Sequence, residues 1–492
     1  MPLIKSISGI RGTIGGTSGE NLTPIDVVKF TAAFVSLIVE NKSQISNLKS
    51  QISILVGRDA RVSGEIISQL VCAILQSMGV NVIDVGLSTT PSVEMAVVKH
   101  QANGGIIITA SHNPMEWNAL KLLNEKGEFI SAKEGKRLLE IAEKEEFNFA
   151  TVDKLGSYTK YENAIEDHIN EILKLDLVDV DAIREAGFSV VFDAVNSTGG
   201  IAIPMLLDKL GVTNYKAING DPTGIFSHNP EPLPENLHEI SSTMQKAEKE
   251  KSRKGEEEKG ERRKEQGDDS YALTLLRSYA LFDVGFAVDP DVDRLAIVME
   301  NGVMFGEEYT LVAIADYVLQ HKKGNTVSNL SSSRALRDIS ERYGVTYTPA
   351  SVGEVNVVEK MKETDAVIGG EGNGGVILPE LHYGRDALVG IALFLSFMAK
   401  SKLKCSEIKA LYPNYVIIKN KIELTKYINI EELLQKVAEK FAEYNPNTVD
   451  GVKIDFETGW VHLRPSNTEP IIRIYAEAAT EAEAQRLVHE LH

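Results

Sequence analysis

The sequence has 492 residues, of which 43% are hydrophobic, and its formal net charge at pH 7 is −18. This length exceeds what one hydrophobic core can organise and corresponds to roughly three or four domains. The acidic balance argues against a nucleic-acid partner or an anionic membrane surface, because both repel a negatively charged protein.

The cysteines and the apolar stretches indicate the compartment. Cys72 and Cys405 are the two cysteines of the chain, and each stands in an apolar helical pattern. Buried, reduced thiols fit this pattern better than a disulfide does. The sequence shows no charged leader followed by an apolar stretch, and no window of about 20 apolar residues. We therefore expect a soluble cytoplasmic protein.

Strands and amphipathic helices alternate in the first part of the chain. The apolar periodicity predicts a helix over 24–40, a strand over 53–56, a helix from about residue 65, a strand over 82–85 and a helix over 132–145. Polar turns that contain glycine separate several of these elements. The alternation is typical of βαβ units and predicts a largely parallel sheet.

A short apolar strand over 104–108 leads into the sequence Thr-Ala-Ser-His-Asn-Pro at 109–114. Open α/β sheets bind ligands at the carboxyl ends of their strands. The Asn-Pro pair ends the extended run and favours a tight turn. The pattern therefore presents Ser111 as a candidate nucleophile, with His112 beside it. The alternative is a turn that only ends a strand.

A second unit begins with a predicted helix over 162–173 and a strand over 189–193, which ends in a glycine-rich turn. The tetrapeptide Ser-His-Asn-Pro recurs at 227–230. A turn-rich segment precedes Ser227 where a strand precedes the first copy. We therefore do not expect the serine of the second copy, Ser227, to be a catalytic nucleophile.

Residues 246–269 are almost devoid of apolar side chains and alternate acidic with basic residues. Such a segment cannot bury enough surface to offset the entropy of ordering unless it forms a solvated, charged helix. We predict a surface insertion, either a charged helix or a flexible loop. Its acidic residues nearly match the basic ones, which argues against nucleic-acid binding.

Three carboxylates stand at alternate positions between two predicted strands, over 284–288 and 295–299: Asp289, Asp291 and Asp293. Their mutual repulsion is usually relieved by a hard divalent cation such as Mg²⁺. The alternative is an acidic, solvated turn. The pattern predicts a metal site.

A third unit, from about residue 307, contains two candidate ligand loops. One is Ser-Val-Gly-Glu-Val-Asn at 351–356, with Gly353 and Glu354. The other has five glycines around Glu371 and Asn373, which allows close approach of a small ligand. A carboxylate and an amide suit vicinal sugar hydroxyls, although glycines can also serve backbone geometry alone.

From about residue 413 the pattern changes to alternating strands with a helix over 430–444. Strands over 459–463 and 471–476 flank the sequence Arg-Pro-Ser-Asn-Thr-Glu-Pro. Its donors, and those just beyond it, suit a tetrahedral anion, whereas a plain hairpin connection is the alternative. The candidate phosphate-binding residues are Arg464, Ser466, Asn467, Thr468 and Arg473.

In this order, the loops at 109–114, 289–294 and 464–470 closely resemble those of the α-D-phosphohexomutase superfamily. The resemblance covers nearly the whole chain. Two features depart from it: the charged insertion is extra, and the loop after Glu371 lacks the histidine of many relatives. The resemblance implies three similar α/β domains with mixed, largely parallel sheets and a smaller C-terminal α+β domain around a central cleft. The expected bounds are 1–155, 156–303, 304–405 and 406–492.

The resemblance also implies the chemistry. Ser111 would carry a phosphoryl group and, with the three aspartates, would hold one Mg²⁺. A hexose 1,6-bisphosphate would serve as intermediate and activator between 1- and 6-phosphates of a hexose. Arg294 would assist transfer, and the cradle would bind the phosphate that does not react. Proton-transfer or electrostatic partners would be Lys121, His112, Arg11 and Arg61, with the general base left open.

Several alternatives remain at this point. A metal-dependent phosphatase would use the same serine but admit water, which a mutase must exclude. A non-catalytic sugar-phosphate sensor is a second rival, although neither the serine nor an aspartate is lost here. The opening residues and the glycine-rich loop favour glucosamine phosphate as substrate, with mannose and glucose phosphates as alternatives. We expect a monomer or a homodimer.

Overall fold

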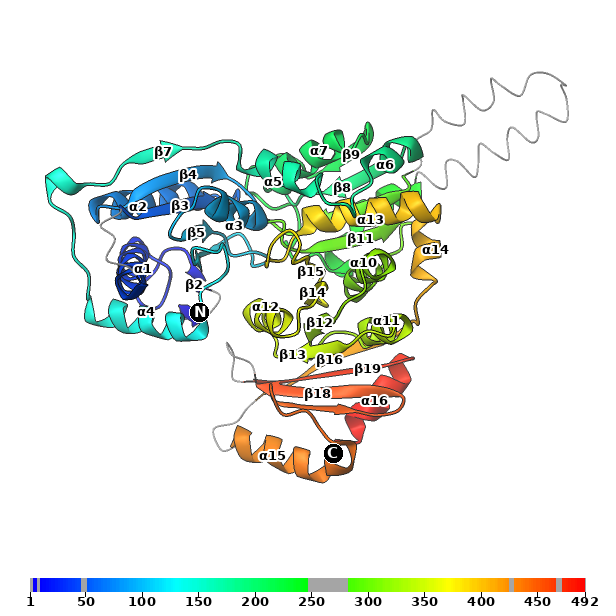
Figure 1. Ribbon diagram of the computed structural model, residues 1–492. Coiled ribbons are helices and arrows are strands. Elements are labelled where there is room, and N and C mark those ends of the chain that lie inside the picture. Colours follow the sequence, from blue (N-terminus) through cyan, green and yellow to red (C-terminus); the bar gives the residue numbers. More distant parts are fainter. Residues whose placement is uncertain are drawn as a thin grey trace, which may run out of the picture.

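The computed structural model describes residues 3–6, 9–45, 51–246, 282–423, 429–465 and 471–491, with the side chains of 6 and 43–45 excepted. It contains four separate sheets, of seven, four, four and four strands, which follow one another along the chain (Figure 1). Three sheets are mixed and the last is antiparallel, which confirms the predicted fold class. Within the described ranges, no helix has the length and apolar character needed to cross a bilayer.

The first unit lies at the left of Figure 1. The sheet order is β1-β2-β6-β5-β3-β4-β7, with β3 parallel to β4 and β5. Apolar residues of α1, α2 and α4 pack on one face of this sheet, and those of α3 pack on the other. Its elements are β1 (Ile4–Ser6), β2 (Gly9–Thr13), α1 (Pro24–Ile45), β3 (Ser53–Arg58), α2 (Gly64–Ser77), β4 (Asn81–Leu87), α3 (Thr90–Lys99), β5 (Gly105–Ile108), β6 (Trp117–Leu123), α4 (Ala132–Lys144), a 3-10 turn (Val152–Lys154) and β7 (Tyr158–Lys160).

Two elements of this unit differ from the sequence pattern. Strand β6 was not predicted, because all of its residues are buried and it lacks the alternation of a half-exposed strand. It pairs antiparallel with β5 and β2, so the sheet is parallel only in part. Strand β7 pairs with β4 and extends this sheet beyond residue 155.

The second unit has the strand order β11-β10-β8-β9, and β10 pairs antiparallel with β11 across the acidic turn. Both of these strands are buried, as their apolar sequences predict. The elements are α5 (Ala164–Ile172), α6 (Val180–Ala186), β8 (Ser189–Asp193), α7 (Gly199–Lys209), β9 (Asn214–Ile218), a 3-10 turn (Pro234–Asn236), β10 (Val284–Val288) and β11 (Leu295–Met299). The predicted insertion at 246–269 lies outside the described residues, apart from its first residue.

The third unit has the strand order β13-β12-β14-β15. Glu354 is the first residue of α12 and Glu371 is the last residue of β14, so both stand in regular elements where loops were expected. The elements are α10 (Glu307–His321), β12 (Thr326–Asn329), α11 (Ala335–Tyr343), β13 (Tyr347–Ala350), α12 (Glu354–Glu363), β14 (Ile368–Glu371), β15 (Gly375–Ile377), α13 (Ala387–Ser401) and α14 (Cys405–Lys409).

The second and third units share one hydrophobic core. Helix α13 is apolar on every side, and residues 387–398 are all buried. A helix of this kind needs neighbours all around it. Apolar residues of α7 and β8 in the second unit and of α10 in the third pack in the same cluster as those of α13. These two units therefore form a common base, while the first unit has cores of its own.

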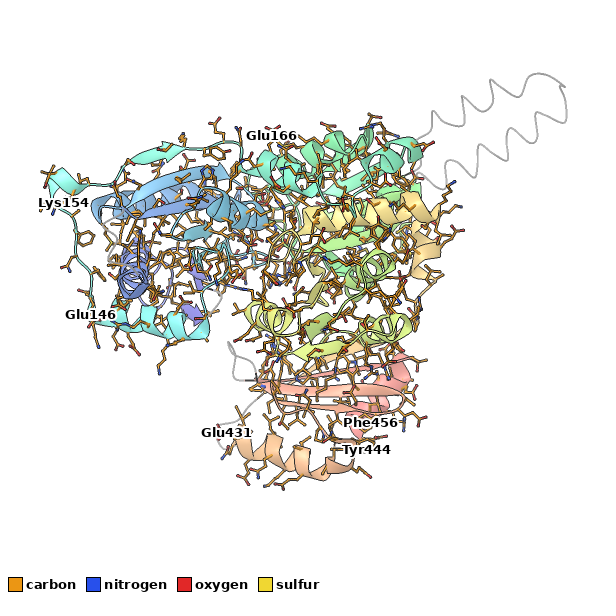
Figure 2. All side chains as sticks on the ribbon, viewed as in Figure 1. Glu146, Lys154, Glu166, Glu431, Tyr444 and Phe456 are labelled. Carbon is orange, nitrogen blue, oxygen red and sulfur yellow. The ribbon has the colours of Figure 1, made fainter. Side chains whose placement is uncertain are left out.

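The C-terminal unit is an antiparallel sheet of order β16-β19-β18-β17 with two helices on one face. Figure 2 shows Tyr444 and Phe456 beside each other below this sheet, with ring centroids 4.8 Å apart. On the other face, His462 Nδ1 lies 2.9 Å from Ser331 Oγ of the third unit. The elements are β16 (Val416–Glu423), α15 (Ile430–Lys440), a 3-10 turn (Ala442–Tyr444), β17 (Val452–Asp455), β18 (Gly459–Pro465), β19 (Ile471–Ala478) and α16 (Glu481–His489).

Candidate active site

The serine turn follows β5 at the carboxyl end of the strand. Ser111 is 3% exposed and has a φ of 48°, a left-handed conformation that costs energy for a residue with a side chain. Its N–H donates to Thr109 Oγ1, and its Oγ donates to Asp289 Oδ2 at 2.6 Å. The strained turn thus aims the hydroxyl at the acidic turn of the second unit.

A buried arginine holds the backbone of this turn. Arg61 is 1% exposed, and its Nε donates to Asp59 Oδ2 at 3.0 Å. Its other N–H groups donate to backbone carbonyls, and its predicted role as a proton-transfer or electrostatic partner stays a prediction. The guanidinium donates to four backbone carbonyls, those of Ser111, Asn113, Pro114 and Trp117. Sequence pattern alone missed this clamp, because Arg61 and the turn are about fifty residues apart.

The three predicted metal-binding carboxylates converge in the fold. Asp289, Asp291 and Asp293 are fully buried, and each offers an oxygen within 4.8 Å of those of the other two. Asp289 Oδ1 accepts the N–H groups of residues 293 and 294, which closes the turn on itself. The structure therefore places a compact group of acidic oxygens beside the hydroxyl of Ser111.

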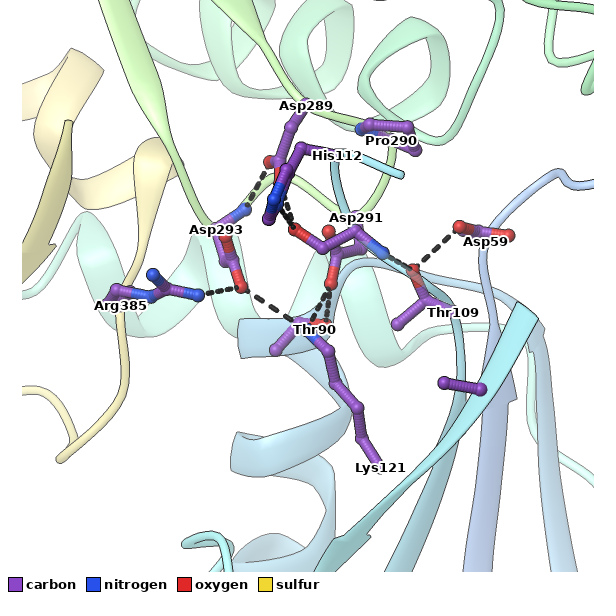
Figure 3. A network of polar contacts seen from close by, with 12 residues as sticks. Asp59, Thr90, Thr109, His112, Lys121, Asp289, Pro290, Asp291, Asp293 and Arg385 are labelled. Atoms are coloured by element: carbon purple, nitrogen blue, oxygen red, sulfur yellow. Dashed lines mark hydrogen bonds and ion pairs between the residues drawn. The ribbon is translucent and has the colours of Figure 1, made fainter. Parts of the chain in front are cut away.

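Cations from two other units reach the triad, as Figure 3 shows. Lys121 Nζ on β6 lies 2.7 Å from Asp291 Oδ2 and 3.3 Å from Asp293 Oδ2. Arg385, just before α13, donates to Asp293 Oδ2 at 2.7 Å. Thr90 Oγ1, at the start of α3, donates to Asp291 Oδ2 at 2.6 Å. The metal-site turn is thus fixed by both neighbouring units.

These surroundings shift the pKa values of Asp289 and Asp293 in opposite directions. Burial raises the pKa of Asp289 well above its usual range, and the charges of Asp293 and Asp291 raise it further. Burial also disfavours the charge on Asp293, but Arg385 and Lys121 outweigh burial and lower its pKa. Asp289 therefore has more to gain than Asp293 from an added divalent cation.

The donor set fits a hard cation. Asp291 Oδ1 and Asp293 Oδ1 are buried and, among the described residues, have no hydrogen-bond partner. A buried carboxylate oxygen without a partner is costly. Carboxylate oxygens together with a serine oxygen are the ligands that Mg²⁺ prefers. The triple-aspartate site can therefore bind a metal ion.

Arg385 links the triad to the predicted sugar loops. Its guanidinium donates to Glu371 Oε2 at 2.9 Å and lies 3.1 Å from Glu354 Oε2. Glu371 Oε1 in turn accepts from the N–H of Gly353 and from Asn329. Asn373 instead accepts the N–H of Gly375 within the hairpin turn. Arg385 was not singled out from the sequence, where it appears only as one polar residue before a helix.

One cleft of about 610 Å³ collects residues of the first three units. Asn373 is absent from its described lining. Asn356, in the same predicted loop as Gly353 but not among the predicted site residues, is present. The predicted site residues that line the cleft are Arg11, Ser111, His112, Lys121, Arg294, Gly353, Glu354 and Glu371, and Arg385 joins them.

The polar groups around the serine have distinct protonation tendencies. Burial and the cations Arg294 and Arg11 hold the pKa of His112 well below its usual value, so its imidazole is neutral. His112 Nδ1 lies 3.4 Å from Ser111 Oγ. Burial lowers the pKa of Lys121, but Asp291 and Asp293 raise it more, so the ammonium stays charged. A neutral imidazole can accept a proton, whereas this ammonium cannot.

The predicted phosphate cradle is described only at its edges. Arg464, at the end of β18, has its guanidinium 3.6 Å from Asp450 Oδ2. Arg473 on β19 stands opposite Arg464 in the strand register. Ser466, Asn467 and Thr468 lie outside the described residues, and their role stays a prediction.

Models of all four domains of the phosphoglucomutase/phosphomannomutase family match the chain, in order. The alpha/beta/alpha domains I, II and III match residues 4–149, 166–252 and 306–415, and the C-terminal domain matches 424–492. A solved structure of a family member from Burkholderia thailandensis superposes with a TM-score of 0.79 at 24% sequence identity, and it covers 99% of this chain and 96% of its own. The arrangement of the four units is thus that of a known fold.

Two relatives extend the similarity along the whole sequence. The phosphoglucomutase/phosphomannomutase of Thermococcus kodakarensis is 34% identical over 480 residues, 96% of this chain and 95% of the relative. The phosphoglucosamine/phosphogalactosamine mutase of Sulfurisphaera tokodaii is 31% identical over 490 residues, 98% of this chain and 97% of the relative. Fold, domain matches and relatives agree that the chain belongs to the phosphoglucomutase/phosphomannomutase family, the phosphohexomutases that isomerise hexose phosphates by phosphoryl transfer.

Proposed function

We propose that the chain interconverts the 6- and 1-phosphates of glucosamine through a phosphoserine at Ser111. The observation that carries the proposal is the 2.6 Å contact between Ser111 Oγ and Asp289 Oδ2 at the wall of a cleft shared by three units. A serine so placed faces both the acidic triad and a substrate in the cleft.

The proposed reaction has two transfers. The bond between phosphorus and Ser111 Oγ breaks while a bond forms to the free hydroxyl of the hexose phosphate, which yields a 1,6-bisphosphate. The bisphosphate turns over in the cleft, and its other phosphoryl group returns to the serine. His112 is proposed to accept the hydroxyl proton, because its imidazole is neutral and stands beside the reacting oxygen.

The acidic triad and the arginines have separate parts. Asp289, Asp291 and Asp293, with the oxygen of Ser111, would hold one Mg²⁺, which supplies positive charge against the transferring phosphoryl oxygens. Arg11 and Arg294 line the cleft and lie close enough to His112 to lower its pKa, so they are placed to attract the anionic group. Arg464 and Arg473 are proposed to hold the phosphate that does not react.

The choice of sugar follows the relatives. The Sulfurisphaera tokodaii relative is named for glucosamine and galactosamine phosphates, and the Thermococcus kodakarensis relative for glucose and mannose phosphates. Glu354 and Glu371 line the cleft and share the one guanidinium of Arg385, so their combined negative charge is only partly balanced and favours the ammonium group of an aminosugar. Mannose and glucose phosphates are the second candidates. The proposal also includes a cytoplasmic location and a monomer or homodimer.

The test is a panel assay with glucosamine, mannose and glucose 1-phosphates, Mg²⁺ and a trace of the matching 1,6-bisphosphate. Isomer and free phosphate are measured in the same reaction. We expect isomer to form fastest from the glucosamine compound, with little free phosphate. Free phosphate without isomer would show a phosphatase, and a faster rate with mannose or glucose phosphate would change the proposed sugar.

A further inference from the structure

A buried chain of acidic and imidazole groups lies next to the active site without touching the cleft. Glu94, on α3 of the first unit, is 2% exposed, and its Oε2 lies 3.2 Å from His382 Nδ1 of the third unit. His382 Nε2 lies 3.3 Å from Asp386 Oδ2, which is also 2.8 Å from His168 Nε2 on α5. One relay of side chains therefore joins all three α/β units.

Two members of this relay, Asp386 and His168, make further hydrogen bonds. Asp386 Oδ1 accepts the N–H groups of Leu388 and Val389, which caps the N-terminus of α13. His168 Nδ1 lies 2.9 Å from Ser92 Oγ, on the same helix as Glu94. His168, His382 and Asp386 offer ligand atoms within 4.8 Å of one another, but both imidazoles already reach Asp386 Oδ2. Hydrogen bonding accounts for the cluster without a metal ion.

Two members of the relay stand on either side of Arg385, the residue that links the metal-site carboxylates to those of the sugar loops. His382 and Asp386 stand on either side of Arg385, whose guanidinium contacts Asp293, Glu371 and Glu354. Thr90, one helical turn before Glu94 on α3, donates to Asp291. The same face of α3 thus touches the metal-site turn and the loop of Arg385.

The loop is shaped to receive Glu94. A Cβ atom at position 384 would lie 1.9 Å from Glu94 Oε2, so the glycine there makes room for the carboxylate. The buried carboxylate thus packs against this loop and pairs with His382, and both contacts hold the loop to α3. Resting on the proposed function, we propose that Glu94 and His382 are positioning residues, which lock the 382–386 loop against α3 and so fix Arg385 between the metal-site and sugar-loop carboxylates.

Protonation supports the contact. Burial raises the pKa of Glu94 to about 8, opposed by His382 and Lys121 and reinforced by Glu354. Burial lowers the pKa of His382, but Asp386 on its own loop and Glu94 across the interface raise it to about 10. Glu94 therefore ionises at a lower pH than the one at which His382 loses its proton, and the two side chains carry opposite charges between about pH 8 and 10. The attraction between them is lost as the pH rises through the folded pKa of His382.

The experiment is a double-mutant cycle between Glu94→Gln and Arg385→Lys at pH 9, at which Glu94 is ionised and His382 protonated in the wild type, with isomer formation and Mg²⁺-dependent thermal stabilisation as readouts. Loss of a residue that orients a metal-site group typically costs about 10- to 100-fold in activity or metal affinity. We expect Glu94→Gln to lower kcat and Mg²⁺ affinity by about 10-fold, with a smaller change in KM. In the Arg385→Lys background the same substitution should have almost no further effect.

Two further variants isolate the cause. Glu128→Gln removes another contact between the first and third units, the ion pair with Lys362, at a site that does not line the cleft, and it should leave kcat within about 2-fold. Gly384→Ala keeps both ionisable groups but displaces the carboxylate, and it should reproduce the loss of Glu94→Gln. It also provides the test where Glu94→Gln fails to fold.

Equal losses from Glu94→Gln with and without Arg385, or a loss from Glu128→Gln as large, would overturn the positioning role. So would a lower melting temperature with unchanged kcat and Mg²⁺ affinity. A wild-type protein that forms no isomer would refute the proposed function instead, and the Mg²⁺ readout of the cycle would still report on the positioning role.

Discussion

The sequence Ser-His-Asn-Pro occurs twice, at 111–114 and 227–230, and the structure gives the two copies opposite environments. The first follows buried strand β5, and its serine is 3% exposed and bonded to Asp289. The second follows a loop, and its serine is exposed. Four identical residues thus form a candidate nucleophile in one place and a surface turn in the other, because the preceding strand and the surrounding groups differ.

The segment just before the second copy packs against the turn that bears Arg61. Phe226, just before it, has its ring 5.0 Å from the guanidinium carbon of Arg61, the residue that clamps the serine turn. A Cβ at Gly224 would lie 1.9 Å from the carbonyl oxygen of Ala60, so this segment packs closely on the turn that bears Arg61. Residues 224–226 therefore form a buttress, a segment that packs against the turn of Arg61 and stabilises it.

The largest expected difference is between the two serines. Ser111→Ala should lower isomer formation by at least about 10⁴-fold, because it removes the oxygen that carries the phosphoryl group. Ser227→Ala should change it by less than about 2-fold, since this side chain is exposed. Isomer formation is measured for both, with circular dichroism and substrate binding as controls of folding. Comparable losses in the two variants would contradict the assignment of the first copy as the active one.

The next largest difference is between the carboxylates beside the two copies, because only those beside the first copy should depend on Mg²⁺. Chelation should lower activity by about 10³-fold, because a bound cation contributes several kcal/mol to transition-state charge, and Mg²⁺ should restore it. Asp291→Asn should weaken activation by Mg²⁺. Asp193, the carboxylate beside the second copy, accepts a hydrogen bond from Val195 N–H, so Asp193→Asn should reduce stability and leave the Mg²⁺ dependence intact. Titration of activity with Mg²⁺ distinguishes these results.

The clamp should matter less than the metal. Arg61→Lys keeps the charge but removes most of the donors to the serine turn. A reacting group displaced by about 1 Å costs about 10²-fold in rate, so kcat should fall by up to this amount, while substrate binding changes little. Rapid kinetics of phosphoryl transfer to Ser111 measures this loss. A variant with normal kcat and a lower melting temperature would show that the clamp serves stability alone.

The site could be predicted only in part from the sequence. Ser111 and the aspartates stand out because short motifs follow recognisable apolar strands, and the structure confirms those strands. Arg385 and Thr90 do not, because each acts across a unit boundary and is locally an ordinary polar residue before or in a helix. Arg61 was named from the sequence, but its clamp on a turn about fifty residues away could not be predicted from local pattern. Strand β6 was missed for a related reason: complete burial removes the alternation that marks a strand.

The buttress should have a small effect. Phe226→Leu keeps an apolar side chain but removes the ring over Arg61, an interaction of about 0.5–2 kcal/mol. We expect the free energy of unfolding to fall by about 1 kcal/mol and kcat to fall less than in Arg61→Lys. In the Arg61→Lys background the Phe226 substitution should cost less. Chemical denaturation of the wild type, the two single variants and the double variant measures the coupling free energy. An equal loss of stability from Phe226→Leu in both backgrounds would show that Phe226 and Arg61 do not interact.

The smallest difference concerns the two histidines of the repeated tetrapeptide. Burial and nearby arginines lower the pKa of His112 well below its usual value. Burial also lowers the pKa of His228, but a hydrogen bond from its Nε2 to Asp193 and one from Nδ1 to the carbonyl of Asn229 require both ring protons and raise it above 6.5. The stabilisation by His228 is therefore complete below about pH 6.5 and disappears as the pH rises through the folded pKa. NMR titration should show His112 neutral across pH 6–8 and His228 still titrating. His228→Gln should remove at most about 1 kcal/mol of stability, and only on the acidic side, since above the folded pKa the wild-type imidazole is neutral as well.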